Sequence, residues 1–404
     1  MQAVGRQATK IRSIAVLLVS ELAAMSLWFV SAAVLPEMLA EVDIPSVRQA
    51  ALSSGVQGGF VCGALLSAWF GLADRVDPRR LFAIAAVAAG LVNALLLVLP
   101  PGGAASIGCR VATGALLACV YPVGMKIAIG WGQRDRGFLV GLLIGALTLG
   151  SAAPHLLAFA GHTNWRLTVL VASMASVIAG VLVVAVRLGP YHVRSPRFDP
   201  AVIVTAWTNK RVRLAYAGYF GHMWELYAMW AWIATAATVS YGKSMPLQDA
   251  AQWAKLTAFV SMAAGGVASV LAGLVSDRIG KAETAAFAMI VSGASALLVA
   301  INFGGAPWLM FVLVVIWGIS IVPDSAQFSA LVADACRPDQ AGSLMTFQTA
   351  LGFALTLFTV QVVPVLAGLF GWSLVIVGLS FGPAVGVVAM LRLRSIHLAD
   401  RNLA

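Results

Sequence analysis

Long apolar stretches recur along the whole chain and are separated by short polar segments. About 20 consecutive apolar residues suffice to cross a bilayer as a helix, and the stretches are too long for the strands of a membrane barrel. Lipid cannot satisfy an open backbone, so each stretch should be helical. We therefore predict an all-α polytopic membrane protein with twelve transmembrane helices, over residues 14–35, 51–73, 81–100, 106–128, 138–160, 166–187, 213–239, 256–276, 284–302, 307–330, 344–368 and 372–391.

The longest polar connection, residues 188–212, lies between the sixth and seventh apolar stretches. It contains three prolines, at positions 190, 196 and 200, together with several arginines. This connection predicts three parts of the chain: an N-terminal six-helix bundle at 1–187, a cytoplasmic linker at 188–212 and a C-terminal six-helix bundle at 213–404.

Composition excludes an ordinary soluble protein. The 404 residues are 60% hydrophobic and only 10% charged, whereas soluble domains carry about 25% charged residues. The net charge of +10 marks topology and does not indicate a nucleic-acid partner, because most basic residues fall at helix ends on one side of the predicted membrane. The opposite loops hold only Arg48, Arg166, Lys243 and Lys255. We expect both termini in the cytoplasm and a bacterial-type inner membrane.

Other sequence signals argue against a metal site, a cofactor or a cleaved leader. The four cysteines form no CxxC pair, and no phosphate loop or nucleotide fingerprint is present. The first apolar stretch is longer than the hydrophobic region of a signal peptide, which has about 7–15 residues, and it contains Glu21. We predict a retained first span, no metal and no cofactor.

The two halves of the chain resemble each other at an offset of 201 to 204 residues. Three pairs of segments match: Glu21 to Trp28 with Glu225 to Trp232, Asp74-Arg75 with Asp277-Arg278, and Tyr121-Pro122 with Val322-Pro323. Six spans separate the copies, so both halves have the same orientation. The sequence thus predicts two pseudo-symmetric bundles, as in transporters built from parallel repeats.

Residues 71–80 and 273–281 resemble the signature loop of the major facilitator superfamily, G-x-x-x-D-R-x-G-R-R. The first copy departs from it, with Phe70 at the leading glycine and Asp77-Pro78 at the second. Arg110 and Gly114 are similar to the family's R-x-x-x-G motif. The resemblance implies that Asp74 and Asp277 latch helices together in an outward-facing state. The implied gating residues are Asp74, Arg75, Arg79, Arg80, Asp277, Arg278, Gly280 and Lys281.

Ionisable residues inside the spans cost about 2.5–3.5 kcal/mol each at a helix centre, which favours a functional role. Helical spacing places His222 on the same face as Glu225, so we predict that they form a proton-binding pair. The resemblance implies that spans one, four, seven and ten line a central cavity. Structural contacts between helices are the alternative. The candidate substrate- and proton-binding residues are Glu21, Met25, Trp28, Arg110, Tyr121, His222, Glu225, Met229, Trp232, Asp324 and Gln327.

These features favour a monomeric secondary active transporter, embedded in membrane lipid, that moves a small molecule across the inner membrane by alternating access. We predict that this transport is coupled to the movement of protons. The substrate and the direction of transport stay open. One alternative is a drug or metabolite efflux antiporter, although span five lacks the adjacent Gly-Pro of that group. A polytopic membrane enzyme is a second alternative. We expect no enzyme, because no cluster of catalytic side chains falls at one membrane face.

Overall fold

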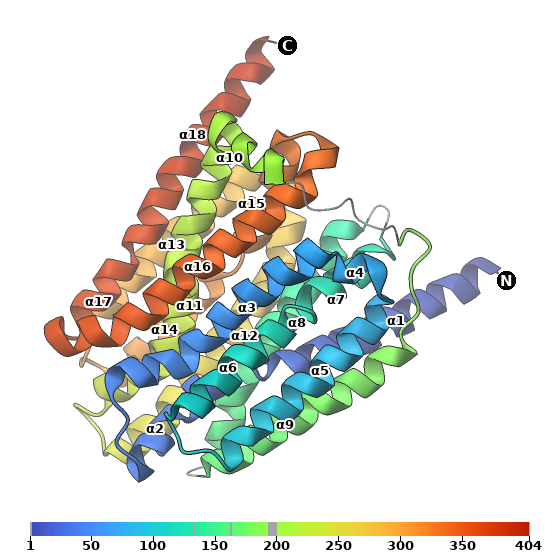
Figure 1. Ribbon diagram of the computed structural model, residues 1–404. Coiled ribbons are helices and arrows are strands. Elements are labelled where there is room, and N and C mark those ends of the chain that lie inside the picture. The colour runs from blue at the N-terminus through green and yellow to red at the C-terminus, as the bar shows by residue number, and fades with distance from the viewer. Residues whose placement is uncertain (1, 133–134, 162–163, 193–199, 404) are drawn as a thin grey trace. The chain divides into compact units, whose positions relative to one another are not determined.

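The computed structural model describes residues 2–132, 135–161, 164–192 and 200–403, and these residues form helices joined by short turns (Figure 1). Within them, 11 helical stretches are long and apolar enough to cross a membrane. The helix Lys210–Tyr241 is not one of these 11, but its 32 residues reach about 48 Å at about 1.5 Å per residue, which is long enough to cross a bilayer. The predicted all-helical, polytopic fold is confirmed.

The helices divide into two compact units, Met1–Ser195 and Pro196–Ala404, each with its own internal contacts. The predicted linker at 188–212 contains this division, and its residues 193–199 lie outside the described residues. Each unit is therefore considered by itself.

The first unit contains six spans, two of which are broken in the middle. Helix α3 packs along α6, α5 along α9, and α1 along both α8 and α9. The helices are α1 (Gln2–Met25), α2 (Val30–Glu41), α3 (Ser46–Phe70), α4 (Leu72–Arg75), α5 (Pro78–Ala94), α6 (Ala104–Leu117), α7 (Tyr121–Ile129), α8 (Arg136–Ala160) and α9 (Trp165–Leu182), with 3-10 turns η1 (Leu95–Leu97) and η2 (Val183–Ala185).

The second unit is built around α11, which packs against α12, α16 and α18. Its elements are η3 (Pro200–Ile203), α10 (Val204–Thr208), α11 (Lys210–Tyr241), α12 (Leu247–Ile279), α13 (Lys281–Ile301), α14 (Pro307–Ile321), α15 (Ser325–Ala335), α16 (Pro338–Phe370), α17 (Trp372–Leu379) and α18 (Phe381–Leu403).

Two of the helix breaks fall at matched positions of the internal repeat. Span four divides into α6 and α7 just before Pro122, and span ten divides into α14 and α15 around Pro323. A proline inside a helix lacks the N–H donor and clashes with the carbonyl four residues earlier. The first span also breaks, between Met25 and Val30, although no proline lies there.

Small residues bring α3 and α6 into backbone contact. A Cβ atom added at Gly59 would lie 1.9 Å from the carbonyl oxygen of Val111, and one at Gly63 would lie 2.4 Å from that of Ala115. Glycine is therefore required at these positions by close helix approach.

We expect Gly59→Ala to destabilise the first unit by about 1–3 kcal/mol, because the added methyl group forces two helix backbones apart. Thermal unfolding of the detergent-solubilised protein would measure this. Gly108→Ala on α6 is the matched control, since a Cβ atom there meets nothing within 4 Å. It should be neutral or slightly stabilising. Equal behaviour of the two variants would contradict the close approach.

Candidate functional site

In the first unit, the break in the first span is held by a buried arginine. Arg110 of α6 is fully buried, and its Nη2 donates to the carbonyl oxygens of Leu27 at 2.8 Å and Trp28 at 2.7 Å. Its Nη1 donates to Oδ1 of Asn93 at 2.7 Å, and its Nε to the carbonyl oxygen of Leu52 at 3.3 Å. A cation is favourable beside the exposed carbonyls of a helix C-terminus, which here is the end of α1.

These contacts define what Arg110 does. All three nitrogen atoms of its guanidinium are engaged by protein acceptors from the first span, α3 and α5. Asn93 continues the network by donating to the Ser173 hydroxyl at 2.9 Å. The substrate- or proton-binding role of Arg110 stays a prediction; its contacts place it at carbonyl oxygens that the break leaves without helical donors.

Glu21 lies before this break and has no exposed surface. A Cβ atom at Gly124 of α7 would lie 2.5 Å from Glu21 Oε2, so the carboxyl group fits against a glycine. Tyr121, one turn before Gly124, is close enough to interact with it electrostatically. Among the described residues neither Glu21 oxygen has a hydrogen-bond partner.

In the second unit, Glu225 of α11 is held by two donors from neighbouring helices. Its Oε1 accepts from Trp317 Nε1 of α14 at 2.7 Å, and its Oε2 accepts from the Ser292 hydroxyl of α13 at 2.8 Å. Glu225 and Trp317 are each 1% exposed. The carboxyl group is therefore buried between three helices, with both oxygens engaged.

His222 lies on the same helix as Glu225 but contacts a different acid. Its Nδ1 is 2.9 Å from Asp324 Oδ1, and its Nε2 is 2.8 Å from the Ser325 hydroxyl. The predicted pairing of His222 with Glu225 is thus wrong. Residues three apart share a helix face, but their partners come from other helices: α15 begins beside His222, whereas α13 and α14 meet α11 at Glu225.

The aromatic and methionine candidates all lie in buried surroundings. The Trp28 ring packs on Phe60 of α3 with centroids 5.0 Å apart. Trp232 donates its N–H to the carbonyl oxygen of Val360 at 2.9 Å. Met25 and Met229 are buried within their own units, and Gln327 is buried on α15 one turn after Asp324.

The signature loops show which of the implied ion pairs form. Arg79 pairs with Asp77 at 2.6 Å and donates to the carbonyl oxygen of Val186 at 3.3 Å, while Lys281 pairs with Asp334 at 2.5 Å. Gly280 has φ +105° between α12 and α13, a conformation that favours glycine. Three other members, Arg75, Arg80 and Arg278, are exposed, and the side chains of Asp74 and Asp277 lie outside the described residues. The latch role stays a prediction.

Asp77, a departure from the signature motif, is the N-cap of α5. Its Oδ1 accepts from the backbone N–H of Arg79 at 2.9 Å, with Pro78 at the start of the helix. The aspartate–proline pair therefore begins a helix where the motif has glycine. Hydrogen bonding to the Arg79 side chain lowers the pKa of Asp77 from 3.8 to about 2.

We expect Asp77→Asn to keep the cap but to lose the ion pair, at a cost below about 1 kcal/mol because the pair is partly exposed. A lowered pKa stabilises the folded state above the ordinary value of 3.8. The difference between wild type and variant should hold at neutral pH and disappear as the pH falls from about 4 to about 2. Thermal unfolding at several pH values measures it. A difference that is independent of pH would contradict the assignment.

Two amides that sequence reasoning missed are also buried in mid-span. Gln57 of α3 and Gln348 of α16 have no exposed surface, and among the described residues neither amide has a hydrogen-bond partner for its nitrogen or its oxygen. Ser292 was missed as well, and Trp317, which helical spacing places on the same side of span ten as Asp324 and Gln327, was not among the candidates. A single amide within an otherwise apolar run is a usable sequence signal, whereas a serine or tryptophan in such a run is too common to be one.

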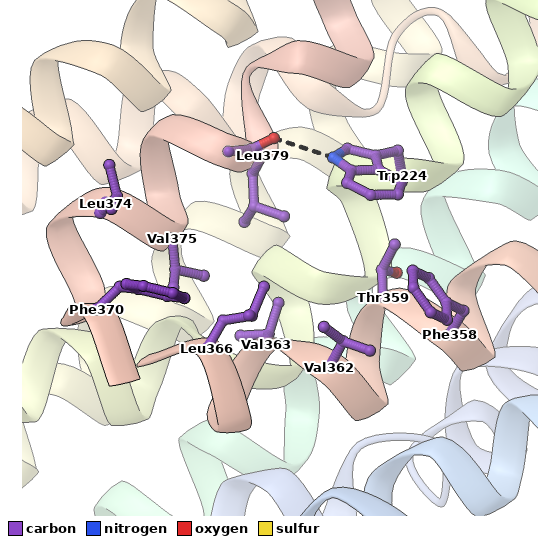
Figure 2. Close-up of a pocket in the computed structure, with 11 residues that line it drawn as sticks. Trp224, Phe358, Thr359, Val362, Val363, Leu366, Phe370, Leu374, Val375 and Leu379 are labelled. Atoms are coloured by element: carbon purple, nitrogen blue, oxygen red, sulfur yellow. Dashed lines mark hydrogen bonds between the residues drawn. The ribbon is translucent and has the colours of Figure 1, made fainter. Parts of the chain in front are cut away.

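A groove of about 160 Å³ in the second unit is apolar, and no acidic residue lines it (Figure 2). Side chains of α11, α16 and α17 line it, among them Phe358, Leu366 and Leu374. The Trp224 N–H at its edge donates to the carbonyl oxygen of Gly378 at 3.1 Å. The groove therefore suits hydrocarbon and not a hydrophilic substrate. Over the described part of the chain, no group of three or more His, Cys, Asp or Glu could hold a metal ion.

Comparison with known proteins gives one family match. The family model described as Major Facilitator Superfamily matches residues 16–355. The solved structure of a mutant of the nucleoside transporter NupG is similar to this chain with a TM-score of 0.70, covering 95% of this chain and 99% of that one. The two sequences are 14% identical, so the similarity is one of fold. No curated protein matches the sequence significantly.

Proposed function

The chain belongs to the major facilitator superfamily and is a secondary transporter, and from this premise we propose that it couples the movement of a small molecule to protons. The observation that carries the proposal is the set of buried titratable groups in the second unit. Glu225, His222 and Asp324 are each no more than 2% exposed. Glu225 and His222 lie in α11, and Asp324 lies at the break between α14 and α15, in a stretch long and apolar enough to cross a membrane. Ionisable groups at such positions are costly, which favours a functional role.

The hydrogen bonds of Glu225 indicate where its proton would sit. The indole N–H of Trp317 can only donate, so a proton on Oε1 would face another donor and break that bond. A hydroxyl can also accept, so a proton on Oε2 can be donated to Ser292. The Ser292 hydroxyl then turns toward the carbonyl oxygen of Met289, which lies 3.5 Å away. Proton binding at Glu225 would thereby reverse the direction of the hydrogen bond between α11 and α13.

His222 and Asp324 form a second group that can hold a proton. Imidazole and carboxylate lie 2.9 Å apart, so a proton on the imidazole makes an ion pair, and its loss leaves a buried negative charge. Glu21 of the first unit, with no described hydrogen-bond partner, adds a carboxyl group whose charge would be unpaired. Changes in proton occupancy alter the number of buried charges, and hence the relative free energy of the access states.

Membrane orientation forms part of the proposal. We place both termini in the cytoplasm of a bacterial-type inner membrane and treat the protein as a monomer whose residues 1–187 rock against 213–404. The distribution of basic residues supports this orientation. Tags at residues 5 and 400 that react with an impermeant reagent from opposite sides of the membrane would refute it.

A small polar or amphipathic molecule is the proposed substrate class. Nucleosides come first in the test, because a solved nucleoside transporter shares the fold. Purified protein in liposomes would be offered a substrate panel with and without an imposed pH gradient. We expect accumulation that follows the gradient and stops when a protonophore dissipates it. Accumulation that does not depend on the gradient would contradict coupling. Export of the substrate, in place of uptake, would identify an efflux antiporter.

A further inference from the structure

Gln57 of α3 is a buried polar side chain without a described hydrogen-bond partner. It has no exposed surface, and neither its amide oxygen nor its amide nitrogen has a hydrogen-bond partner among the described residues. Ser53, one turn earlier on α3, is 3% exposed, and its hydroxyl is likewise unpartnered. Buried polar groups in proteins are almost always paired, so each exception requires a reason.

The packing of α3 shows which way Gln57 points. Gly55 and Gly59 face α6, because a Cβ atom at either position would meet Val111. At about 100° per residue, Gln57 stands about 200° around the helix from both glycines. It therefore points away from α6. Phe60, one turn further on, shares that side and packs on Trp28 of the broken first span.

The break in the first span is followed by another buried hydroxyl without a described partner. Ser31 of α2, three residues after Trp28, is 2% exposed, and its hydroxyl has no described partner. Helices α2 and α3 are in contact. On α3, the Gln57 amide and the Ser53 hydroxyl thus share a side with Phe60, which packs on Trp28 next to the break that Arg110 holds.

We propose that Gln57, with Ser53 beside it, recognises an uncharged, planar part of the substrate that carries a hydrogen-bond donor next to an acceptor, such as the lactam edge of a nucleobase. A carboxamide offers both donor and acceptor and matches such an edge at two points. The flat side of the ring would pack on the Trp28 and Phe60 rings. The proposal rests on the transport function proposed above and names the chemistry of its substrate.

One test needs no substrate. Gln57→Met keeps the length of the side chain and removes the unpaired amide, so we expect the melting temperature of the substrate-free protein to rise by about 2–4 °C. Gln361→Met on α16 is the matched control, because Gln361 is half-buried and forms an interaction. The melting temperature of this variant should stay unchanged or fall. A fall for Gln57→Met would show that a protein group or an ordered water pairs the amide, and would overturn the proposal.

A second test uses uridine and N3-methyluridine as probes, measured by counterflow in liposomes without a pH gradient. Methylation removes the lactam donor, so wild type should prefer uridine by at least about 100-fold, and Gln57→Met should reduce this preference to a few-fold. If neither probe exchanges, or if the preference survives the substitution, the assigned substrate chemistry is wrong. Counterflow does not depend on proton coupling, so failure of the coupling proposal would leave this result unaffected.

Discussion

Replacing Glu225 by glutamine is expected to abolish uptake driven by a pH gradient while leaving counterflow exchange largely intact. Glutamine can keep both hydrogen bonds in one orientation: its oxygen accepts from the Trp317 N–H, and its amide donates to the Ser292 hydroxyl. The variant therefore resembles the protonated state permanently. It cannot bind or release a proton, so a proton gradient has nothing to act on at this position.

Uptake and counterflow of one substrate, measured on the same liposome preparation, separate coupling from binding. Glu283→Gln is the matched control: Glu283 is a half-exposed glutamate of the second unit, paired with Arg394 at 3.3 Å, and it should leave both activities unchanged. Gradient-driven uptake that survives in Glu225→Gln would rule out Glu225 as the coupling residue. Loss of counterflow together with uptake would instead mean that Glu225 is needed for the transport cycle itself.

Arg110→Met should give the largest loss of stability in the first unit, on the order of 3 kcal/mol, and with it a loss of transport. Methionine fills part of the space but leaves the carbonyl oxygens of Leu27 and Trp28, at the break, without their donor, together with the amide oxygen of Asn93. Each buried acceptor without a partner costs about 1–3 kcal/mol. Thermal unfolding in detergent, followed by tryptophan fluorescence, would measure the loss.

Two further variants show whether the charge of Arg110 or the geometry of its guanidinium group stabilises the first unit. Arg110→Lys keeps the positive charge beside the end of α1, but a single ammonium group cannot reach acceptors on three helices, so we expect an intermediate loss. Arg48→Met removes an exposed arginine of the same unit and should leave stability unchanged. An unchanged melting temperature for Arg110→Met would show that the first span holds its break without the arginine.

The sequence was sufficient for the helices but not for their breaks. Each apolar stretch must satisfy its own backbone hydrogen bonds in lipid, so its length and composition predict a helix without knowledge of its neighbours. Spans four and ten were predicted as continuous helices, and the structure breaks both of them beside the matched prolines Pro122 and Pro323. The break in the first span was not predictable in this way, because its stabilising donor, Arg110, comes from another helix.

The candidate site was predicted only in part, and the error has a clear cause. Helical spacing correctly placed His222 and Glu225 on one face of α11, but it contains no information about the helices opposite that face. Asp324 and Ser325 became the partners of His222 because α15 begins beside it. Ser292 and Trp317 became the partners of Glu225 because α13 and α14 meet α11 one turn away.

By itself the sequence determined that this chain crosses a membrane many times in two repeated halves, and it determined which costly polar residues each span carries. These properties follow from local requirements, since every residue in lipid must satisfy its backbone within its own helix. Only the tertiary structure decided which polar side chains meet and which, like those of Glu21 and Gln57, stay without a described partner. That outcome depends on how closely and at what rotation neighbouring helices pack, and these quantities are set by contacts between residues far apart in the chain.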